Sequence, residues 1–391
     1  MSLRTLKRAS CSLFGLVAAF AANAAWAVTP SRFNMPPGVT EISQEVYDLH
    51  MLILWVCVVI GVLVFGAMIW SIVRHRKSKG RVAAGFHDNL RVEIAWTVIP
   101  FLILVGMAVP AARVLVKMED TRDADLTIQV TGYQWRWRYD YIDNDFGYFS
   151  NLSRDSNDAR QRGVDIDLTS VDNYLLDVDN PVVVPVGRRI RFLFTSNDVI
   201  HAWWVPQLAV KKDAIPGFIN EMWTKIDVPG VYRGQCAELC GRDHAFMPVV
   251  LIAMTDDDYE AWVAERRELA QAEAEALAAD RDWELDELMQ RGEGVYMSQC
   301  AACHQANGQG LPAAGFPALT SGMSVDPDGV GAHIDMVLNG SPRNSVMAAF
   351  GRSLNNLDLA AVITFERNAF GNDTGDIIQP RDIEAARQQQ R

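Results

Sequence analysis

The chain has 391 residues, a length that favours two or three domains. Its composition is 49% hydrophobic, which suits globular domains combined with membrane segments, and its net charge of −12 argues against nucleic acid as a partner. An acidic surface is better suited to docking a basic protein. Four of the six cysteines form two close pairs, each followed by a histidine, a spacing typical of cofactor sites rather than of a disulfide scaffold.

The first 27 residues have the pattern of a secretory signal peptide. They begin with basic residues, continue with a short apolar run over 13–25 and end in the small-x-small site Ala25-Trp26-Ala27. An additional membrane helix is the alternative, but the apolar run is short for one. We therefore expect cleavage after Ala27.

Residues 28–122 are predicted to form a transmembrane hairpin. Two apolar stretches, 49–73 and 94–116, each exceed the roughly 20 residues that a helix needs to cross a bilayer. We expect Pro100 and Pro110 to kink the second helix rather than break it. The loop between the stretches is rich in Lys and Arg and belongs on the cytoplasmic side, so everything after the second helix lies outside.

Residues 123–255 change to the alternating pattern of β-strands. Short strands are predicted over 126–130, 132–141 and 249–254, with others on either side of Pro185-Val186-Gly187. Several short strands separated by turns predict an antiparallel sandwich or barrel. The polar, Asp-rich stretch 143–180 is interpreted as a surface insertion.

One loop of this domain carries a dense set of soft ligands. Cys236, Cys240, His244 and Met247 lie within about a dozen residues, and sulfur and imidazole ligands suit copper. A mononuclear blue copper site needs one Cys, so the second Cys is surplus. Two thiolates four residues apart could bridge two coppers, each with one imidazole, and His201 is the candidate for the second imidazole.

Two other chemistries are possible for this loop. A disulfide between Cys236 and Cys240 would leave the histidine and the methionine unexplained. Zinc would gain nothing from a thioether ligand. Copper is therefore the favoured interpretation.

The pattern C-x-E-x-C-G-x-x-H-x-x-M, with H-x-W-x-x-P upstream, resembles the dinuclear copper (CuA) loop of cytochrome c oxidase subunit II. The resemblance implies a cupredoxin-like Greek-key fold with the ligands on loops at one end. It also implies the ligand set, in which Glu238 contributes its backbone carbonyl. The six ligands would be His201, Cys236, Glu238, Cys240, His244 and Met247.

The same resemblance implies roles for three further side chains. Trp135 stands where the family has the aromatic through which electrons enter, although Trp135 could instead be a packing residue, and Tyr133 replaces a frequent histidine. The Glu238 carboxylate would bind magnesium, or manganese, at the contact with the catalytic subunit; otherwise it is solvated. Glu93 would lie at the mouth of a proton path; otherwise it is a charged helix flank.

Residues 256–285 are rich in Ala and Glu and predict a helical linker, a semi-rigid spacer that limits the distance of the next module without fixing it. That module, 286–372, is predicted to be all-α. It contains the signature C-x-x-C-H of covalent c-type haem attachment, formed by Cys300, Cys303 and His304. A thioredoxin-like pair is the alternative, but it would not need His304.

The sixth haem ligand is expected downstream of the attachment signature. Met323, Met336 and Met347 are candidates, and His333 could compete. We choose Met347, because its segment resembles the methionine loop of class I cytochromes c, although Ala348 stands where the family usually has proline. His/Met ligation raises the haem potential. The polar tail 373–391 is expected to be disordered.

The order of hairpin, copper domain and haem domain resembles subunit II of caa3-type cytochrome c oxidases. The resemblance implies a bacterial inner-membrane protein with its metal domains on the periplasmic side. Electrons would pass from a cytochrome c or bc1 complex to haem c, to CuA, and to a catalytic subunit I that reduces dioxygen and pumps protons, with subunit III beside it.

Three other classes stay open at this point. The chain could be a free-standing membrane-tethered electron carrier. It could be the CuA part of a nitric or nitrous oxide reductase. It could also have a non-redox role in assembly, or belong to a quinol oxidase, but the complete ligand set and the haem signature argue against these two.

Overall fold

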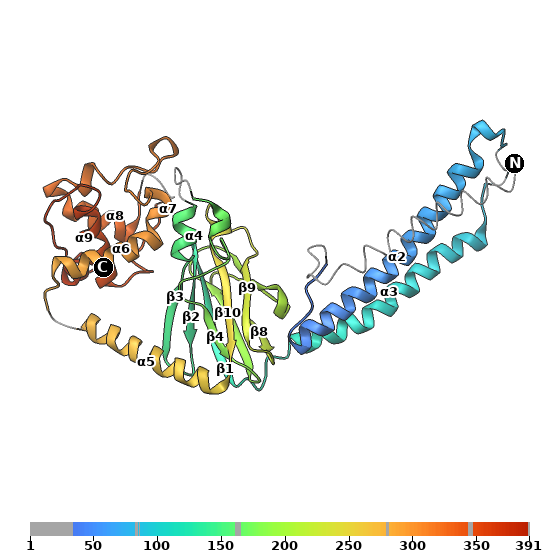
Figure 1. The fold of residues 1–391 in the computed structure, drawn as a ribbon, viewed down its shortest axis with the longest axis horizontal. Coiled ribbons are helices and arrows are strands. Elements are labelled where there is room, and N and C mark those ends of the chain that lie inside the picture. Colours follow the sequence, from blue (N-terminus) through green and yellow to red (C-terminus); the bar gives the residue numbers. More distant parts are fainter. Residues whose placement is uncertain are drawn as a thin grey trace.

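The computed structural model describes residues 34–82, 85, 87–160, 166–278, 281–342 and 347–389. A long helical hairpin, a β-sandwich and a helical domain follow one another, with the sandwich in the middle (Figure 1). The predicted signal peptide lies outside the described residues.

The hairpin consists of α2 (Glu41–His75) and α3 (Leu90–Met118), both long and apolar enough to cross a membrane. Both helices begin before the predicted apolar stretches. Thr40 caps α2 in a capping box, and the Asn89 side chain caps α3. Helix α3 continues through Pro100 and Pro110 without a break. The short helix η1 (Lys77–Lys79) lies in the basic loop between them.

The ends of α2 and α3 nearest the sandwich are joined to each other and to the sandwich by ion pairs and a hydrogen bond. The Lys117 ammonium lies 2.6 Å from a carboxylate oxygen of Glu41 and 2.7 Å from one of Glu45. The Trp223 indole donates to the Lys117 carbonyl over 3.0 Å, and Lys212 pairs with Glu119 at 3.1 Å. These contacts orient the sandwich on the membrane hairpin.

The sandwich has two five-stranded sheets, with strand orders β3-β2-β1-β5-β8 and β4-β10-β9-β6-β7. It is mixed rather than wholly antiparallel as predicted, because β1 pairs in parallel with β5, and β4 with β10. The strands are β1 (Leu126–Tyr133), β2 (Arg136–Tyr141), β3 (Phe146–Ser150), β4 (Val182–Pro185), β5 (Arg189–Ser196), β6 (His201–Val205), β7 (Val210–Ala214), β8 (Asn220–Lys225), β9 (Gly230–Cys236) and β10 (Pro248–Met254).

Large aromatic side chains fill the space between the sheets. Along β5 every second residue is buried, as a half-buried strand requires. Trp137 and Trp203 are fully buried, and the Trp203 indole donates to the Tyr139 hydroxyl over 3.2 Å. This rigid core supports the loops that carry the predicted copper ligands. The short helices of this domain are α4 (Arg154–Ala159), η2 (Leu168–Ser170), η3 (Pro206–Leu208) and η4 (His244–Phe246), of which η4 lies in the copper loop.

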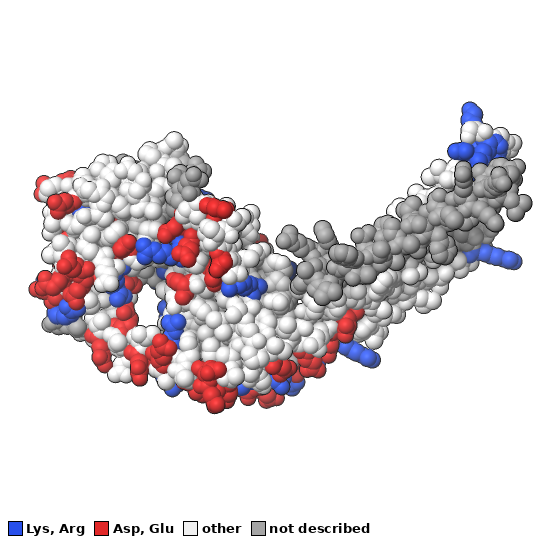
Figure 2. Space-filling view, viewed as in Figure 1, with Lys and Arg blue, Asp and Glu red and all other residues white. Residues whose placement is uncertain are grey.

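The predicted linker is largely one helix, α5 (Asp256–Ala278), which crosses from the sandwich toward the helical domain (Figure 1). Tyr259 and Val263 are buried in the sandwich core. Nearer its other end, Glu273 pairs with Arg291 of the helical domain at 2.5 Å. The linker therefore packs on both domains instead of leaving the second domain unfixed. Its first residues are acidic, and Figure 2 shows many Asp and Glu side chains over this region and the helical domain.

The helical domain is built on the crossing of its first long helix with the helix from 356 to 368. Gly292 lies at this crossing, where a Cβ atom would meet the Ala361 carbonyl oxygen at 2.2 Å. The elements are α6 (Leu285–Gln299), α7 (Ala301–His304), η5 (Pro312–Ala314), η6 (Gly322–Ser324), η7 (Pro327–Gly329), α8 (Val330–Asn339), α9 (Asn356–Asn368) and α10 (Pro380–Gln388).

Gly292→Ala is expected to destabilise the α6–α9 crossing by about 1–3 kcal/mol, because the added methyl group must push two helix backbones apart. Gly294 is the matched control: it lies on the same helix with open space around it, and alanine there should stabilise by about 0.5–1 kcal/mol. Hydrogen exchange of α6 and α9 peptides measures both effects. Equal exchange in the two variants would contradict the packing described here.

The C-terminal segment is not the disordered tail that its polar composition predicts. Helix α10 starts with Pro380 and a capping box between Gln379 and Asp382, and its Ile383 is completely buried in the domain core. The Arg387 guanidinium donates to the Gly351 carbonyl over 2.5 Å. The segment is thus packed on the domain through a buried isoleucine and a hydrogen-bonded arginine.

Candidate metal centre and haem site

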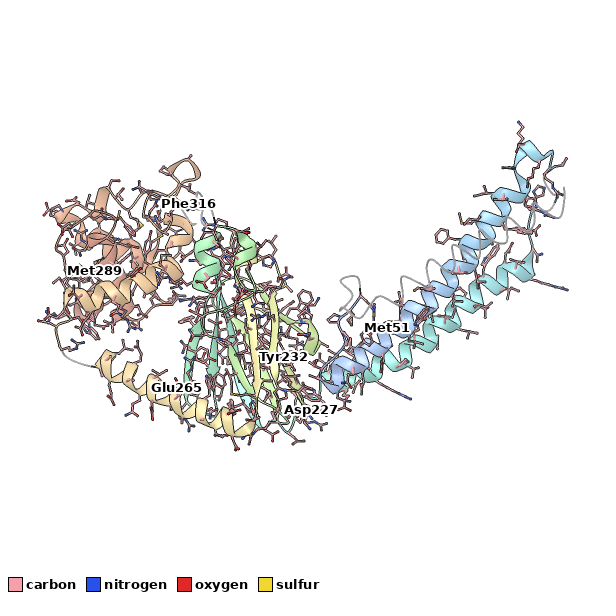
Figure 3. All side chains as sticks on the ribbon, in the orientation of Figure 1. Met51, Asp227, Tyr232, Glu265, Met289 and Phe316 are labelled. Carbon is pink, nitrogen blue, oxygen red and sulfur yellow. The ribbon has the colours of Figure 1, made fainter. Side chains whose placement is uncertain are left out.

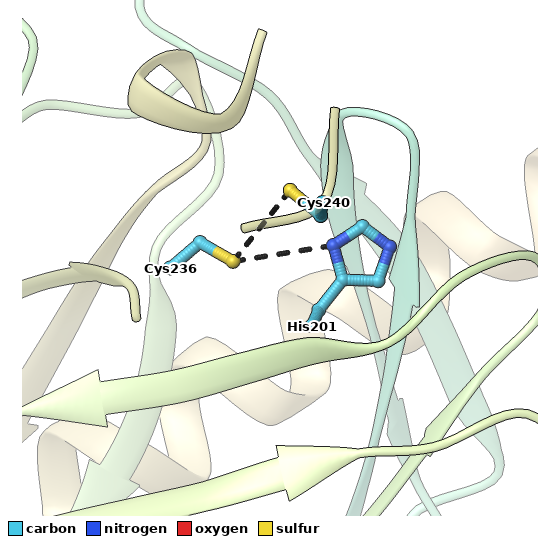
Figure 4. A group of neighbouring side chains, drawn as sticks. All are labelled: His201, Cys236 and Cys240. Atoms are coloured by element: carbon cyan, nitrogen blue, oxygen red, sulfur yellow. Dashed lines mark hydrogen bonds between the residues drawn. The ribbon is translucent and has the colours of Figure 1, made fainter. Parts of the chain in front are cut away.

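The structure brings together all six residues that the copper loop predicts as ligands. His201 begins β6, Cys236 ends β9, and Cys240 lies in the loop that follows (Figure 4). The two Sγ atoms are 3.8 Å apart, and His201 Nδ1 is 4.0 Å from Cys236 Sγ. A disulfide would need about 2.05 Å between the sulfurs, so these are separate thiols.

The remaining three donors surround the same two sulfurs. His244 Nδ1 and Met247 Sδ are each 3.5 Å from Cys240 Sγ, and the Glu238 carbonyl oxygen is 3.3 Å from Cys236 Sγ. Two thiols, two imidazoles, a thioether and a carbonyl match the ligand preference of copper better than that of zinc. The donor set fits a copper centre.

Several residues orient these ligands, and of them the sequence singled out Trp135 alone. Asp198 lies 2.9 Å from His201 Nε2, which leaves Nδ1 directed at Cys236. The Cys240 carbonyl accepts hydrogen bonds from Gln134 over 2.9 Å and from the Trp135 indole over 3.2 Å. The sequence indicated this role for Asp198 only in that an acidic residue lies three positions before a predicted ligand histidine.

The two thiols are electrostatically coupled. The hydrogen bond from Cys240 lowers the pKa of Cys236 to about 4, against the effect of burial. The hydrogen bond to Cys236, together with burial, raises the pKa of Cys240 well above its usual value. One thiolate therefore forms readily, whereas the second negative charge in this buried pocket requires a bound cation.

The predicted haem-attachment residues lie at the end of α6 and on α7, beside a cavity of about 1100 Å³. Cys300, Cys303 and His304 all line it. His304 Nδ1 is 2.9 Å from the Pro317 carbonyl oxygen, so Nε2 is the nitrogen left for a metal. Two thiols, an oriented imidazole and a cavity of this size fit a covalently attached haem.

All three candidate methionines line this cavity, as does Met297, so the choice of Met347 as sixth ligand stays a prediction. Met323, Met336 and Met347 are all half-buried, and the Met347 carbonyl accepts from the Ser341 amide over 3.1 Å. The competing His333 lines the same cavity and stays a candidate: its Nε2 lies 2.7 Å from a Glu366 carboxylate oxygen, in a pair that the sequence did not indicate, and its buried Nδ1 has no hydrogen-bond partner among the described residues.

The other predicted functional residues lie in three different places. Trp135 is half-buried and lines the same cavity as the haem-attachment cysteines while donating to Cys240. The Glu238 side chain is exposed on the copper loop. Glu93 lies in the first turn of α3, at the opposite end of that helix from the sandwich.

Three sequence families match the chain in succession. Residues 28–114 match "Cytochrome C oxidase subunit II, transmembrane domain", residues 126–254 match "Cytochrome C oxidase subunit II, periplasmic domain", and residues 287–365 match "Cytochrome C oxidase, cbb3-type, subunit III".

Individual relatives agree with these matches. A "Probable cytochrome c oxidase subunit 2" of Rickettsia bellii is 40% identical over 64% of this chain and 90% of its own length. The cytochrome c oxidase subunit 2 of Cereibacter sphaeroides is 32% identical over 61% of this chain and 81% of its own. A crystal structure of the periplasmic domain of subunit II from Bradyrhizobium japonicum is 42% identical, with TM-score 0.34, over 38% of this chain and 99% of that one.

Fold, site and relatives define a membrane-anchored electron-transfer protein with a cupredoxin-like domain and a c-type cytochrome domain. The chain belongs to the cytochrome c oxidase subunit II family, in the caa3-type arrangement with a fused cytochrome c, and is a subunit of an oxidoreductase.

Proposed function

We propose that this subunit accepts electrons from an external donor at its haem domain and passes them through a dinuclear copper centre to a catalytic subunit that reduces dioxygen. When bound, haem c and the copper pair would supply the two one-electron redox centres. Cys300, Cys303, His304 and Met347 would hold the haem. The copper pair would be held by His201, Cys236, the Glu238 carbonyl, Cys240, His244 and Met247.

One observation carries this proposal: a single side chain borders both sites. Trp135 lines the cavity that contains Cys303, and its indole donates to the carbonyl of Cys240 over 3.2 Å. A through-bond and through-space route from the haem cavity to the copper loop is therefore short. We infer that Trp135 is the aromatic through which electrons enter the copper centre.

Family membership supports a proposal for the partners and for the membrane side. We propose the inner membrane of a bacterium, with the basic loop between α2 and α3 in the cytoplasm and both redox domains in the periplasm. Subunits I and III would contact the hairpin, whose apolar side chains are widely exposed. A cytochrome c or bc1 complex would be the donor.

Two acidic side chains have proposed roles at the contact with subunit I. The exposed Glu238 carboxylate would contribute to a magnesium site there, on the same residue whose carbonyl faces Cys236. Glu93, in the first turn of α3, would stand at the mouth of a proton path. Glu93→Gln should lower proton pumping per electron while leaving the copper spectrum unchanged.

The experiment that tests the function is affinity purification of the full chain from its membrane. We expect it to bring down a large haem-bearing subunit, with two coppers and one covalent haem on this chain, and to consume oxygen when reduced cytochrome c is added. Recovery of the chain alone would instead support a free-standing electron carrier. Co-purification with activity toward nitric or nitrous oxide would support a different reductase.

A further inference from the structure

Arg242 extends from the copper loop into the helical domain. It lies two residues after Cys240 and two before His244, and its Nη2 is 3.0 Å from the Cys303 sulfur. Its guanidinium carbon is also 4.6 Å from the centre of the Phe316 ring, and Figure 3 labels Phe316 where the two domains meet. One side chain thus joins the loop between two copper ligands to a haem-attachment cysteine.

A buried carboxylate fixes Arg242 in this position. Arg242 Nε lies 3.2 Å from one oxygen of Asp243, and Arg160 approaches the other oxygen at 3.4 Å. Asp243 is only 5% exposed, so its charge needs both guanidinium partners. Arg160 in turn lies 4.2 Å above the Phe246 ring and donates to the Asn157 side chain over 2.8 Å.

The network closes on the segment that carries the haem. The Asn157 amide donates over 3.0 Å to the carbonyl of Met297, on the last turn of α6 before Cys300. The contacts that begin at Cys303 and run through Arg242, Asp243, Arg160 and Asn157 therefore end on the same helix segment, 297–304. The network thus contacts this segment at Met297 and at Cys303.

We propose that Arg242 is the positioning residue that docks segment 297–304 on the copper loop and that its charge favours the reduced state of the attached haem. Arginine suits this role because its planar guanidinium can donate hydrogen bonds and stack on an aromatic ring at the same time, and it stays charged. A cation next to the thioether sulfur disfavours the extra positive charge of oxidised haem. This inference deepens the proposed function and rests on it.

The test is Arg242→Gln in the full-length oxidase complex. We expect faster hydrogen exchange in 297–304, a lower haem c potential and, after flash photoreduction of haem c, copper reduction slowed by about tenfold, because a small misplacement at an electron-transfer contact is costly. The paramagnetic resonance of the copper pair should be unchanged, which verifies that the loop still folds. Arg242→Lys should have the wild-type haem c potential but the fast hydrogen exchange of Arg242→Gln, because the ammonium keeps the positive charge without the planar guanidinium donors.

Arg154→Gln is the matched control, because it removes a charge at the same interface. Its side chain is 73% exposed, borders the same cavity and pairs with Asp158 at 3.7 Å and with Glu293 of α6 at 3.6 Å rather than with a haem-attachment residue. We expect wild-type potential, exchange and transfer rate in this variant. Equal losses in both variants, or none in Arg242→Gln, would overturn the inference. Copper that stays oxidised after haem photoreduction in the wild type would instead overturn the proposed function, while the exchange and potential measurements still decide the docking.

Discussion

Cys240→Ser in the full-length protein is expected to lose the paired-copper signal and to lower oxygen consumption by at least about 100-fold, since even changes outside the ligand set of a metal site cost 10- to 100-fold. Cys240 Sγ lies within 4 Å of Cys236 Sγ, His244 Nδ1 and Met247 Sδ, so its loss removes a contact from three other donors. Copper analysis and paramagnetic resonance measure the first effect and an oxygen electrode the second.

Cys57→Ser is the control for this prediction. Cys57 is also a free thiol, but it lies in the middle of α2 within the membrane hairpin. Its serine variant should keep two coppers and wild-type oxygen consumption. A Cys240→Ser protein that still held two coppers sharing one electron would remove this thiol from the copper centre.

Met347→Leu is expected to lower the haem c potential by on the order of a few hundred millivolts, within the roughly 0.8 V range that axial ligands span. Leucine keeps nearly the volume of methionine, so the change tests ligation rather than packing. The absorption spectrum should change to that of haem without its thioether ligand. Potentiometric titration of the haem bands gives both results.

Met336→Leu and Met323→Leu serve as matched controls, since both methionines line the same cavity. Each should keep the wild-type spectrum and potential. If one of them lost the thioether ligand while Met347→Leu did not, the sixth ligand would be that methionine. Loss in His333→Gln alone would point to the histidine held by Glu366.

The grouping of the candidate copper and haem residues could be predicted from sequence because most of them lie within short segments. Five of the six candidate copper donors come from a loop of twelve residues, where spacing alone fixes their proximity. The distant His201 was identified by its motif, and the structure brings it 4.0 Å from Cys236. The sheet was predicted less well, since parallel pairing of β1 with β5 depends on strands that are far apart in the chain.

The supporting residues could not be predicted because their partners are remote in sequence. Gln134 and Trp135 meet Cys240 across more than 100 positions, and Arg242 meets Cys303 across 61. No local pattern encodes such contacts, which arise only when the sandwich folds or when two domains dock. The folded C-terminal segment is a different case. Pro380 and Asp382 are helix-start signals that can be read in the sequence, but our prediction gave more weight to the polar composition of the whole segment.

The 23 residues of helix α5, packed on both domains, have a kinetic consequence. A tethered module meets its acceptor at an effective concentration set by geometry, in the millimolar range for short links, instead of by cellular abundance. Under the proposed function the step between the two redox domains is unimolecular and does not depend on ionic strength as collisions do. Diffusion then limits only the arrival of the soluble donor at the haem domain.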